Sequence, residues 1–136
     1  LTTQATIKMI DPLPCVYFNR TAMDQIIRNL LSNAIKYSDK ERCEIIVQAS
    51  EVNGCHQIGV TDNGPGIAPE HQDRIFELFN TIDSEVKSDS HGIGLATVRN
   101  ILNAFGERIW VKSMVGEGAT FYFTLKKRNE YGATRK

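Results

Sequence analysis

The sequence predicts an α/β fold, an α+β two-layer sandwich with three helices on one face of a mixed, mostly antiparallel sheet of about five strands. Three observations support this prediction. One long segment has the apolar spacing of an amphipathic helix, several short segments have strand patterns, and turn residues join most of these strands as hairpins. Hairpins favour antiparallel pairing, so only a minority of the strand pairs should be parallel.

Length and composition indicate one globular domain. The chain has 136 residues, of which 41% are hydrophobic, and 16 basic side chains balance 16 acidic ones. No apolar run reaches the ~18 residues of a membrane span, and zero net charge gives no general attraction to nucleic acid or lipid. We therefore expect one domain over residues 1–136, with a core at about 5–126 and a basic tail at 127–136.

The three cysteines, Cys15, Cys43 and Cys55, have neither an even count nor a C-x-x-C spacing. A disulfide framework or a zinc site would favour one of these patterns, so we expect reduced thiols and a cytoplasmic location. The chain begins at Leu1 without a signal or transit pattern. We expect it to be part of a longer protein, whose other regions can include a membrane anchor.

The first third of the chain predicts two short strands and a long helix. The strands, the second of them at 15–18, flank the proline-rich turn at 11–14. Apolar side chains between Met23 and Ile35 then recur every three or four residues, which is one buried stripe of a helix. Asn19 or Thr21 can cap the start of this helix.

Two hairpins follow. Strands at 44–49 and 56–61 are joined across the turn at 52–54, where Asn-Gly is a strong hairpin signal. Strands at 108–113 and 120–125 flank a glycine-containing turn near the end of the chain.

Two further helices lie between these hairpins. Pro69 opens a short helix, and its apolar residues are Ile75, Phe76, Leu78 and Phe79. Another helix starts near Gly94 and ends before Gly106, with Val98, Ile101, Leu102 and Phe105 on one face. Residues 80–91 between them are polar and lack an apolar period, so we expect a mobile lid there.

The long helix has a polar row beside its apolar stripe. Asn29, Asn33 and Lys36 are spaced i, i+4 and i+7, and Tyr37 lies at the edge of the row. Asparagine is a poor helix former, so two of them one turn apart conflict with local propensity. A solvated face is one explanation, and a site for a magnesium-bound polyphosphate is the other, because amide oxygens suit Mg²⁺ and lysine suits phosphate.

Two glycine-containing loops suggest further contacts with a ligand. Asp62, at the end of a predicted strand, can accept a hydrogen bond from an exocyclic amine such as that of adenine, although an ordinary Asx turn would explain it too. Gly64 and Gly66 allow close approach of a flat group. Gly92 and Gly94 precede a helix, where exposed backbone N–H groups favour an anion, although such pairs are often only flexible turns.

Together these segments resemble the sequence boxes of sensor histidine kinases. Residues 29–37 resemble the N box, 62–67 the first glycine box, 75–79 the F box, 91–96 the second glycine box and 116–121 the final one. The resemblance covers roughly residues 5–126, in order and at familiar separations.

The resemblance implies the catalytic and ATP-binding domain of a histidine kinase with a Bergerat ATP-binding fold. Such a domain transfers the γ-phosphoryl group of Mg²⁺-bound ATP to a histidine imidazole. The implied ATP-binding residues are Asn29, Asn33, Lys36, Tyr37, Asp62, Gly64, Gly66, Ile67, Phe76, His91, Gly92, Ile93, Gly94, Leu95 and Thr120. Asn33 would be the magnesium ligand, Asn29 and Lys36 would face the phosphates, and Thr120 would lie beneath the adenine.

The implied partners are dimerisation and phosphoacceptor helices upstream of this chain and the receiver domain of a response regulator. Nucleic acid and direct membrane contact are not expected. His56, His71 and His91 lack the context of a phosphoacceptor histidine, so we expect the acceptor to lie elsewhere in the parent protein.

Two alternatives remain open. A related ATPase clamp is disfavoured, because hydrolytic members of the fold carry a glutamate one helical turn before the metal-binding asparagine and this chain has Asn29 there. A degenerate nucleotide-binding or docking module is favoured only by departures in the lid. Thr81 stands where an arginine is common, and Ser90 and His91 also depart from the usual pattern.

Overall fold

The computed structural model describes residues 4–10, 13–77 and 94–127. The described strands are β1 (Gln4–Met9), β2 (Arg42–Val52), β3 (Cys55–Asp62), β4 (Ile109–Ser113) and β5 (Ala119–Lys126). They form one five-stranded sheet in the order β1-β2-β3-β5-β4, in which β1 and β2 are parallel and the other pairs antiparallel. The predicted mixed, mostly antiparallel sheet is therefore confirmed.

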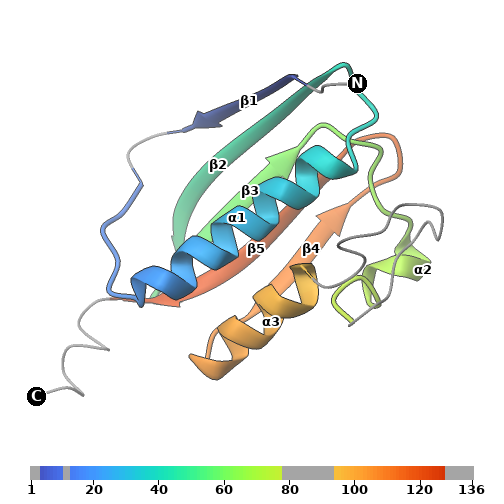
Figure 1. Ribbon diagram of the computed structural model, residues 1–136. Helices are drawn as coiled ribbons and strands as arrows, with labels where there is room; N and C mark the ends of the chain where they lie inside the picture. Colours follow the sequence, from blue (N-terminus) through green and yellow to red (C-terminus); the bar gives the residue numbers. More distant parts are fainter. Residues whose placement is uncertain (1–3, 11–12, 78–93, 128–136) are drawn as a thin grey trace, which may run out of the picture.

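The helices form the second layer. The described helices are α1 (Arg20–Lys36), α2 (Pro69–Gln72) and α3 (Gly94–Ala104). α1 and α3 lie across one face of the sheet, and α2 lies at one side of this layer (Figure 1). None of these helices is long and apolar enough to cross a membrane.

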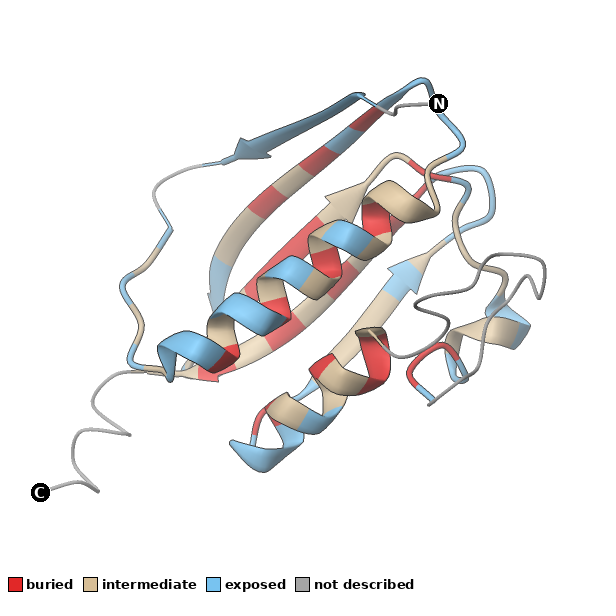
Figure 2. Ribbon diagram, viewed as in Figure 1, coloured by how far each residue is buried: buried red, intermediate tan, exposed pale blue. Residues whose placement is uncertain are grey.

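Helix α1 is formed as its sequence predicts. The Asn19 side chain caps it, accepting a hydrogen bond from the Ala22 backbone N–H at 2.8 Å. Its apolar stripe lies against the sheet, where Ile26 and Leu30 join the fully buried side chains of β5, such as Phe123 (Figure 2). One continuous core thus connects the helix layer with the three central strands.

The expectation of a strand at 15–18 is wrong. These residues form no strand, because β1 already occupies the edge of β2 that an N-terminal strand could use. Val16 and Phe18 still turn toward the core, and the Phe18 ring packs against Phe105 with 4.6 Å between centroids. The run of apolar residues at 15–18 therefore reflects an extended segment that packs alternate side chains against the core, not membership of a sheet.

The short helix after Pro69 is also smaller than expected. α2 ends at Gln72, and Ile75 and Phe76 follow it in turns whose hydrogen bonds span three residues, such as Arg74 N–H to the His71 carbonyl. Both apolar side chains are nevertheless buried. Leu78, Phe79 and the expected lid at 80–91 lie outside the described residues.

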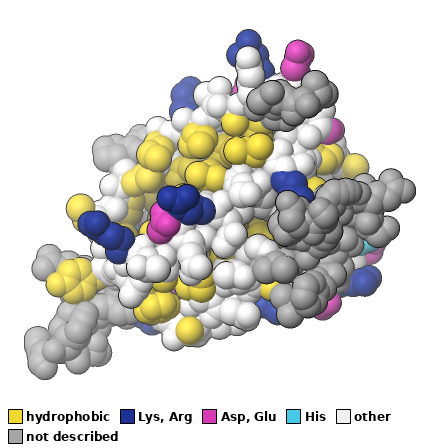
Figure 3. Space-filling view, in the orientation of Figure 1, with side chains coloured by type: hydrophobic (Ala, Val, Ile, Leu, Met, Phe, Trp, Pro, Cys, Tyr) yellow, Lys and Arg dark blue, Asp and Glu magenta, His cyan; other side chains and the backbone are white. Residues whose placement is uncertain are grey.

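The edge strand β1 is only partly covered. Ile7 and Met9 share the face of Ile45 and Val47 by their register with β2, but they are 45% and 62% exposed. Figure 3 shows hydrophobic side chains gathered on this side of the molecule, beside the helix layer. The helices therefore cover the centre of the sheet and leave this edge open.

Glu107 is a buried carboxylate that joins the end of α3 to β5. Its side chain accepts hydrogen bonds from the Thr124 hydroxyl at 2.8 Å and the Lys126 backbone N–H at 2.9 Å. Glu107→Ala should lower the free energy of unfolding by about 1.5–3 kcal/mol, because the hydrogen bonds that the half-buried donors make to a charged acceptor are lost. Urea denaturation of the purified chain measures this change.

The control is Asp24→Ala, which removes the exposed ion pair with Arg28 on α1. Its effect should stay below about 1 kcal/mol, because solvent screens exposed pairs. Equal effects of the two variants would contradict a special role for Glu107.

Candidate functional site

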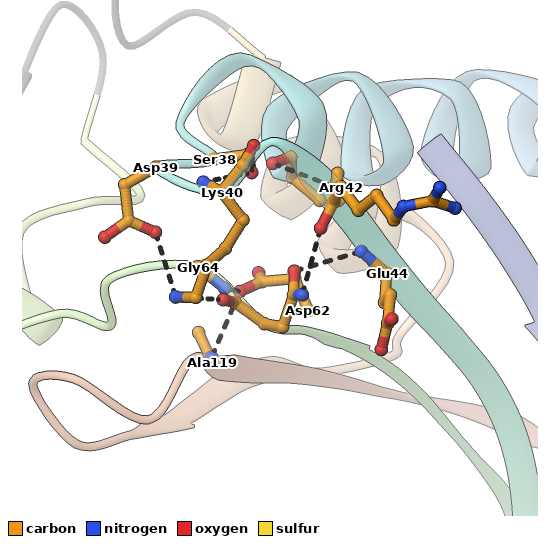
Figure 4. Close-up of polar contacts among 11 residues, drawn as sticks. Ser38, Asp39, Lys40, Arg42, Glu44, Asp62, Gly64 and Ala119 are labelled. Carbon is orange, nitrogen blue, oxygen red and sulfur yellow. Dashed lines mark hydrogen bonds and ion pairs between the residues drawn. The ribbon is translucent and has the colours of Figure 1, made fainter. Parts of the chain in front are cut away.

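The carboxylate of Asp62 lies where β3 ends, opposite Ala119 at the start of β5. Its Oδ1 accepts hydrogen bonds from the backbone N–H of Gly64 at 2.8 Å and of Ala119 at 3.3 Å (Figure 4). Within the described part of the chain both bonds fall on Oδ1, which leaves Oδ2 to accept a bond from a ligand. Burial raises the pKa of Asp62, and the two backbone N–H groups partly offset this rise.

The loop after Asp62 is fastened to the turn between β4 and β5. The Gly116 N–H donates to the Pro65 carbonyl at 2.6 Å, and the Ile67 N–H donates to the Ser113 hydroxyl at 2.8 Å. Gly66 has a φ of +81°, and a methyl group there would overlap the carbonyl of Met114. Only glycine therefore fits this close approach of the two backbones.

Gly118 has the same role on the β5 side of the site. Its φ is +82°, and a methyl group there would overlap the carbonyl oxygen of Asp62. The backbone of Asp62 is thus held against the start of β5, which fixes the position from which its side chain extends.

The polar row of α1 is half-buried, and its first residue, Asn29, lies beside the start of α3. Asn29, Asn33 and Lys36 lie on the last turns of α1, and Tyr37 is its C-cap. The Asn29 side-chain oxygen would lie 3.4 Å from a methyl group at Gly94, the first residue of α3. The structure therefore brings Asn29 and the N-terminus of a helix together, which is a suitable arrangement for phosphate.

Several predicted site residues are mainly core residues. Phe76 is buried and contacts Phe121 edge-on, with 6.1 Å between ring centroids. Leu95 is buried in α3, and Ile67 packs against the core. Gly64 is buried beneath Asp62. His91, Gly92 and Ile93 lie outside the described residues.

Thr120, which the resemblance places beneath the adenine, follows Ala119, the cross-strand partner of Asp62. Its hydroxyl lies 2.9 Å from that of its cross-strand partner Thr61. The residue beside Asp62 is Ala119, and consecutive strand residues point to opposite faces. The contact of Ala119 with Asp62 uses its backbone N–H, so no side chain indicated it in the sequence.

Further positioning residues were not predicted from the sequence. Gln72 donates to the carbonyl groups of Ile67 and Ser113, at 2.8 and 3.1 Å, and so ties α2 to the site loop. Asn63 binds the backbone of β2. Their partners are backbone groups distant in sequence, so only a known register could have indicated them.

Comparison with known proteins identifies the family. The model for the histidine kinase-, DNA gyrase B-, and HSP90-like ATPase family matches residues 18–129. Cyanobacterial phytochrome A from Nostoc sp. (strain PCC 7120) is 41% identical over 115 residues, covering 85% of this chain and 15% of that protein. The adaptive-response sensory kinase SasA from Prochlorococcus marinus is 38% identical over 122 residues, covering 87% and 32%. The chain thus spans less than a third of the length of these relatives.

Solved structures show the same fold. Full-length ShkA, in complex with AMPPNP, is 32% identical with a TM-score of 0.72 and matches 90% of this chain and 25% of that one. The nucleotide-free catalytic domain of the histidine kinase ThkA is 26% identical with a TM-score of 0.74, matching 94% and 81%. With the family model spanning most of its length, this chain belongs to the histidine kinase-, DNA gyrase B- and HSP90-like ATPase family.

Proposed function

We propose that the chain is the ATP-binding domain of a sensor histidine kinase and presents Mg²⁺-bound ATP for phosphoryl transfer to a histidine. The observation that carries this proposal is the arrangement of Asp62. Its carboxylate is held by two backbone N–H groups on one oxygen, while the other oxygen can accept a hydrogen bond from the exocyclic amine of adenine. The similarity to kinases of two-component signalling supports the same function.

The phosphates would lie along the polar row of α1, close to the start of α3. Lys36 would supply positive charge, Asn29 would donate from its amide, and Asn33 would offer its oxygen to Mg²⁺. Amide oxygens and an ammonium group fit this assignment, because Mg²⁺ prefers oxygen ligands and retains several waters. The bound ion would neutralise charge on the transferred group.

Asn29 favours transfer over hydrolysis. A side-chain amide cannot take a proton from water near neutral pH, so this position cannot serve as a general base. In the proposed reaction the imidazole nitrogen forms a bond to the γ-phosphorus, the bond to the bridging oxygen breaks, and ADP leaves. Positioning and charge stabilisation are sufficient for such a transfer.

The proposed partners are the phosphoacceptor and dimerisation helices of the parent protein and the receiver domain of a response regulator. We place the domain in the cytoplasm, where its nucleotide is available. The relatives named above are much longer than this chain, which is consistent with separate acceptor and sensor regions.

Calorimetric titration of the chain with a non-hydrolysable ATP analogue and Mg²⁺ tests the proposal. We expect saturable binding, and no stable phosphorylation of the chain when ATP replaces the analogue, because the acceptor helix is absent. Adding the acceptor segment of the parent protein as a separate chain should produce weak, acid-labile labelling of that segment, since the two parts are not tethered.

Each other outcome points to a different function. Steady phosphate release without an acceptor would indicate an ATPase clamp. Absence of nucleotide binding would indicate a docking module. Acid-labile phosphate on His56, His71 or His91 would show that the acceptor lies within this chain.

A further inference from the structure

Asn63, which directly follows Asp62, continues the sheet with its side chain. The regular pairing of β2 with β3 ends at Ile45 and Asp62. Beyond that point the Asn63 Oδ1 accepts from the Glu44 backbone N–H at 3.0 Å, and its Nδ2 donates to the Arg42 carbonyl at 3.1 Å. One amide side chain thus binds two backbone groups at the start of β2, where the ladder has stopped.

Lys40 adds a contact from the connection between α1 and β2. Its ammonium group donates to the Asn63 carbonyl at 2.9 Å and lies 3.2 Å from the Asp39 carboxylate (Figure 4). Asn63 is therefore fastened at its side chain by β2 and at its carbonyl by Lys40.

These contacts oppose the packing of Gly118 on the other side of Asp62. A methyl group at Gly118 would overlap the Asp62 carbonyl oxygen and lie 3.4 Å from the Asn63 Cα, so the two backbones are already too close for the segment to move toward β5. Such movement would also stretch the two side-chain hydrogen bonds of Asn63 to β2, which lies on the opposite side of β3 from β5. Movement toward β2 would stretch the hydrogen bond from the Ala119 N–H to the Asp62 carboxylate. The direction of the Asp62 side chain is therefore determined from both sides.

We propose that Asn63, assisted by Lys40, is a positioning residue that aims the Asp62 carboxylate at the exocyclic amine of the base and thereby sets selectivity for adenine. This inference rests on the proposed function. Asn63 itself touches no base in the proposed arrangement. Its effect passes through the direction and the charge of Asp62.

Charges around Asp62 give the inference an independent readout. Asp39 and Lys40 face it from the α1–β2 connection, and the buried, neutral Cys43 thiol faces it from β2. Lys40 lowers the pKa of Asp62, whereas Asp39 raises it. Because binding needs the ionised carboxylate, Lys40→Met should move the pH at which ATP affinity is lost upward, and Asp39→Asn should move it downward.

The main experiment compares ATP with purine riboside triphosphate, which lacks the exocyclic amine, by titration of the whole chain with Mg²⁺ present. Asn63→Ala should weaken ATP binding by about threefold to tenfold, the value of one or two hydrogen bonds, and leave the amine-free nucleotide nearly unchanged. The preference for ATP should fall by the same factor. Asn100→Ala, at an exposed position on α3, is the control and should leave the preference unaltered.

A role in stability alone would weaken both nucleotides equally, and an unchanged preference in Asn63→Ala would overturn the inference. If Asn63→Ala does not fold, the pH comparison decides instead, because Lys40 and Asp39 are about half exposed and their variants should fold. Coincident pH profiles of Lys40→Met and Asp39→Asn would then refute the inference. Absence of ATP binding in the unmodified chain is a separate result, since it refutes the proposed function itself.

Discussion

Asp62→Asn should reduce the affinity for ATP by roughly tenfold to 150-fold, because a charge-assisted hydrogen bond is worth about 1.5–3 kcal/mol. The amide oxygen can still accept from Gly64 and Ala119, so the loop should keep its conformation. The amide nitrogen would then face the exocyclic amine of adenine, and two donors would meet. Calorimetric titration measures the affinity, and thermal unfolding without nucleotide checks the fold.

The pH dependence provides a control for this prediction. Burial raises the pKa of Asp62 above the ordinary 3.8, so the unmodified chain should begin to lose ATP affinity at a higher pH than an exposed aspartate would. In Asp62→Asn this pH-dependent loss of ATP affinity should be missing. The same raised pKa means that the ionised carboxylate costs stability above its pKa, so the variant should unfold no more easily at neutral pH. An unchanged dissociation constant would contradict the assignment of Asp62 to the base.

Those parts of the fold that depend on residues close together in the sequence were predictable. Asn19 caps α1, and Asn53 adopts the positive φ of 53° that its Asn-Gly turn requires. The parallel pairing of β1 with β2 was not predictable from such local signals, because α1 separates the two strands in sequence. The segment at 15–18 has a strand pattern but no strand left to pair with.

The same distinction holds for the site. Asp62, Gly64 and Gly66 could be identified from the sequence, because a carboxylate that accepts a hydrogen bond and glycines that allow close approach are evident from residue type alone. Thr120 and Ala119 are adjacent, and only the register of β5 with β3 decides which of them meets Asp62. Asn63 was part of a recognised motif, yet its contacts with β2 became visible only once the end of the ladder was known.

Gly118→Ala should both destabilise the domain and impair the site. Its φ of +82° costs an L-residue about 1–2 kcal/mol, and the new methyl group would also overlap the Asp62 carbonyl. Together these effects should lower the free energy of unfolding by about 2–5 kcal/mol, since overpacking typically adds 1–3 kcal/mol. Urea denaturation measures this loss. ATP titration well below the unfolding transition measures the effect on binding, which should be a large decrease because the backbone of Asp62 must move.

Gly116→Ala is a matched control in the same turn. Gly116 has a similar φ of +86°, but a methyl group there would meet no atom within 4 Å. The control should therefore lose only the conformational part, about 1–2 kcal/mol, and retain most of its affinity for ATP. Equal losses of stability and affinity in the two variants would mean that backbone conformation alone matters at both positions. Of the two variants, the larger loss is expected for Gly118→Ala. At Gly118 the absence of a side chain lets β5 pack against Asp62, the residue that is proposed to hold the base.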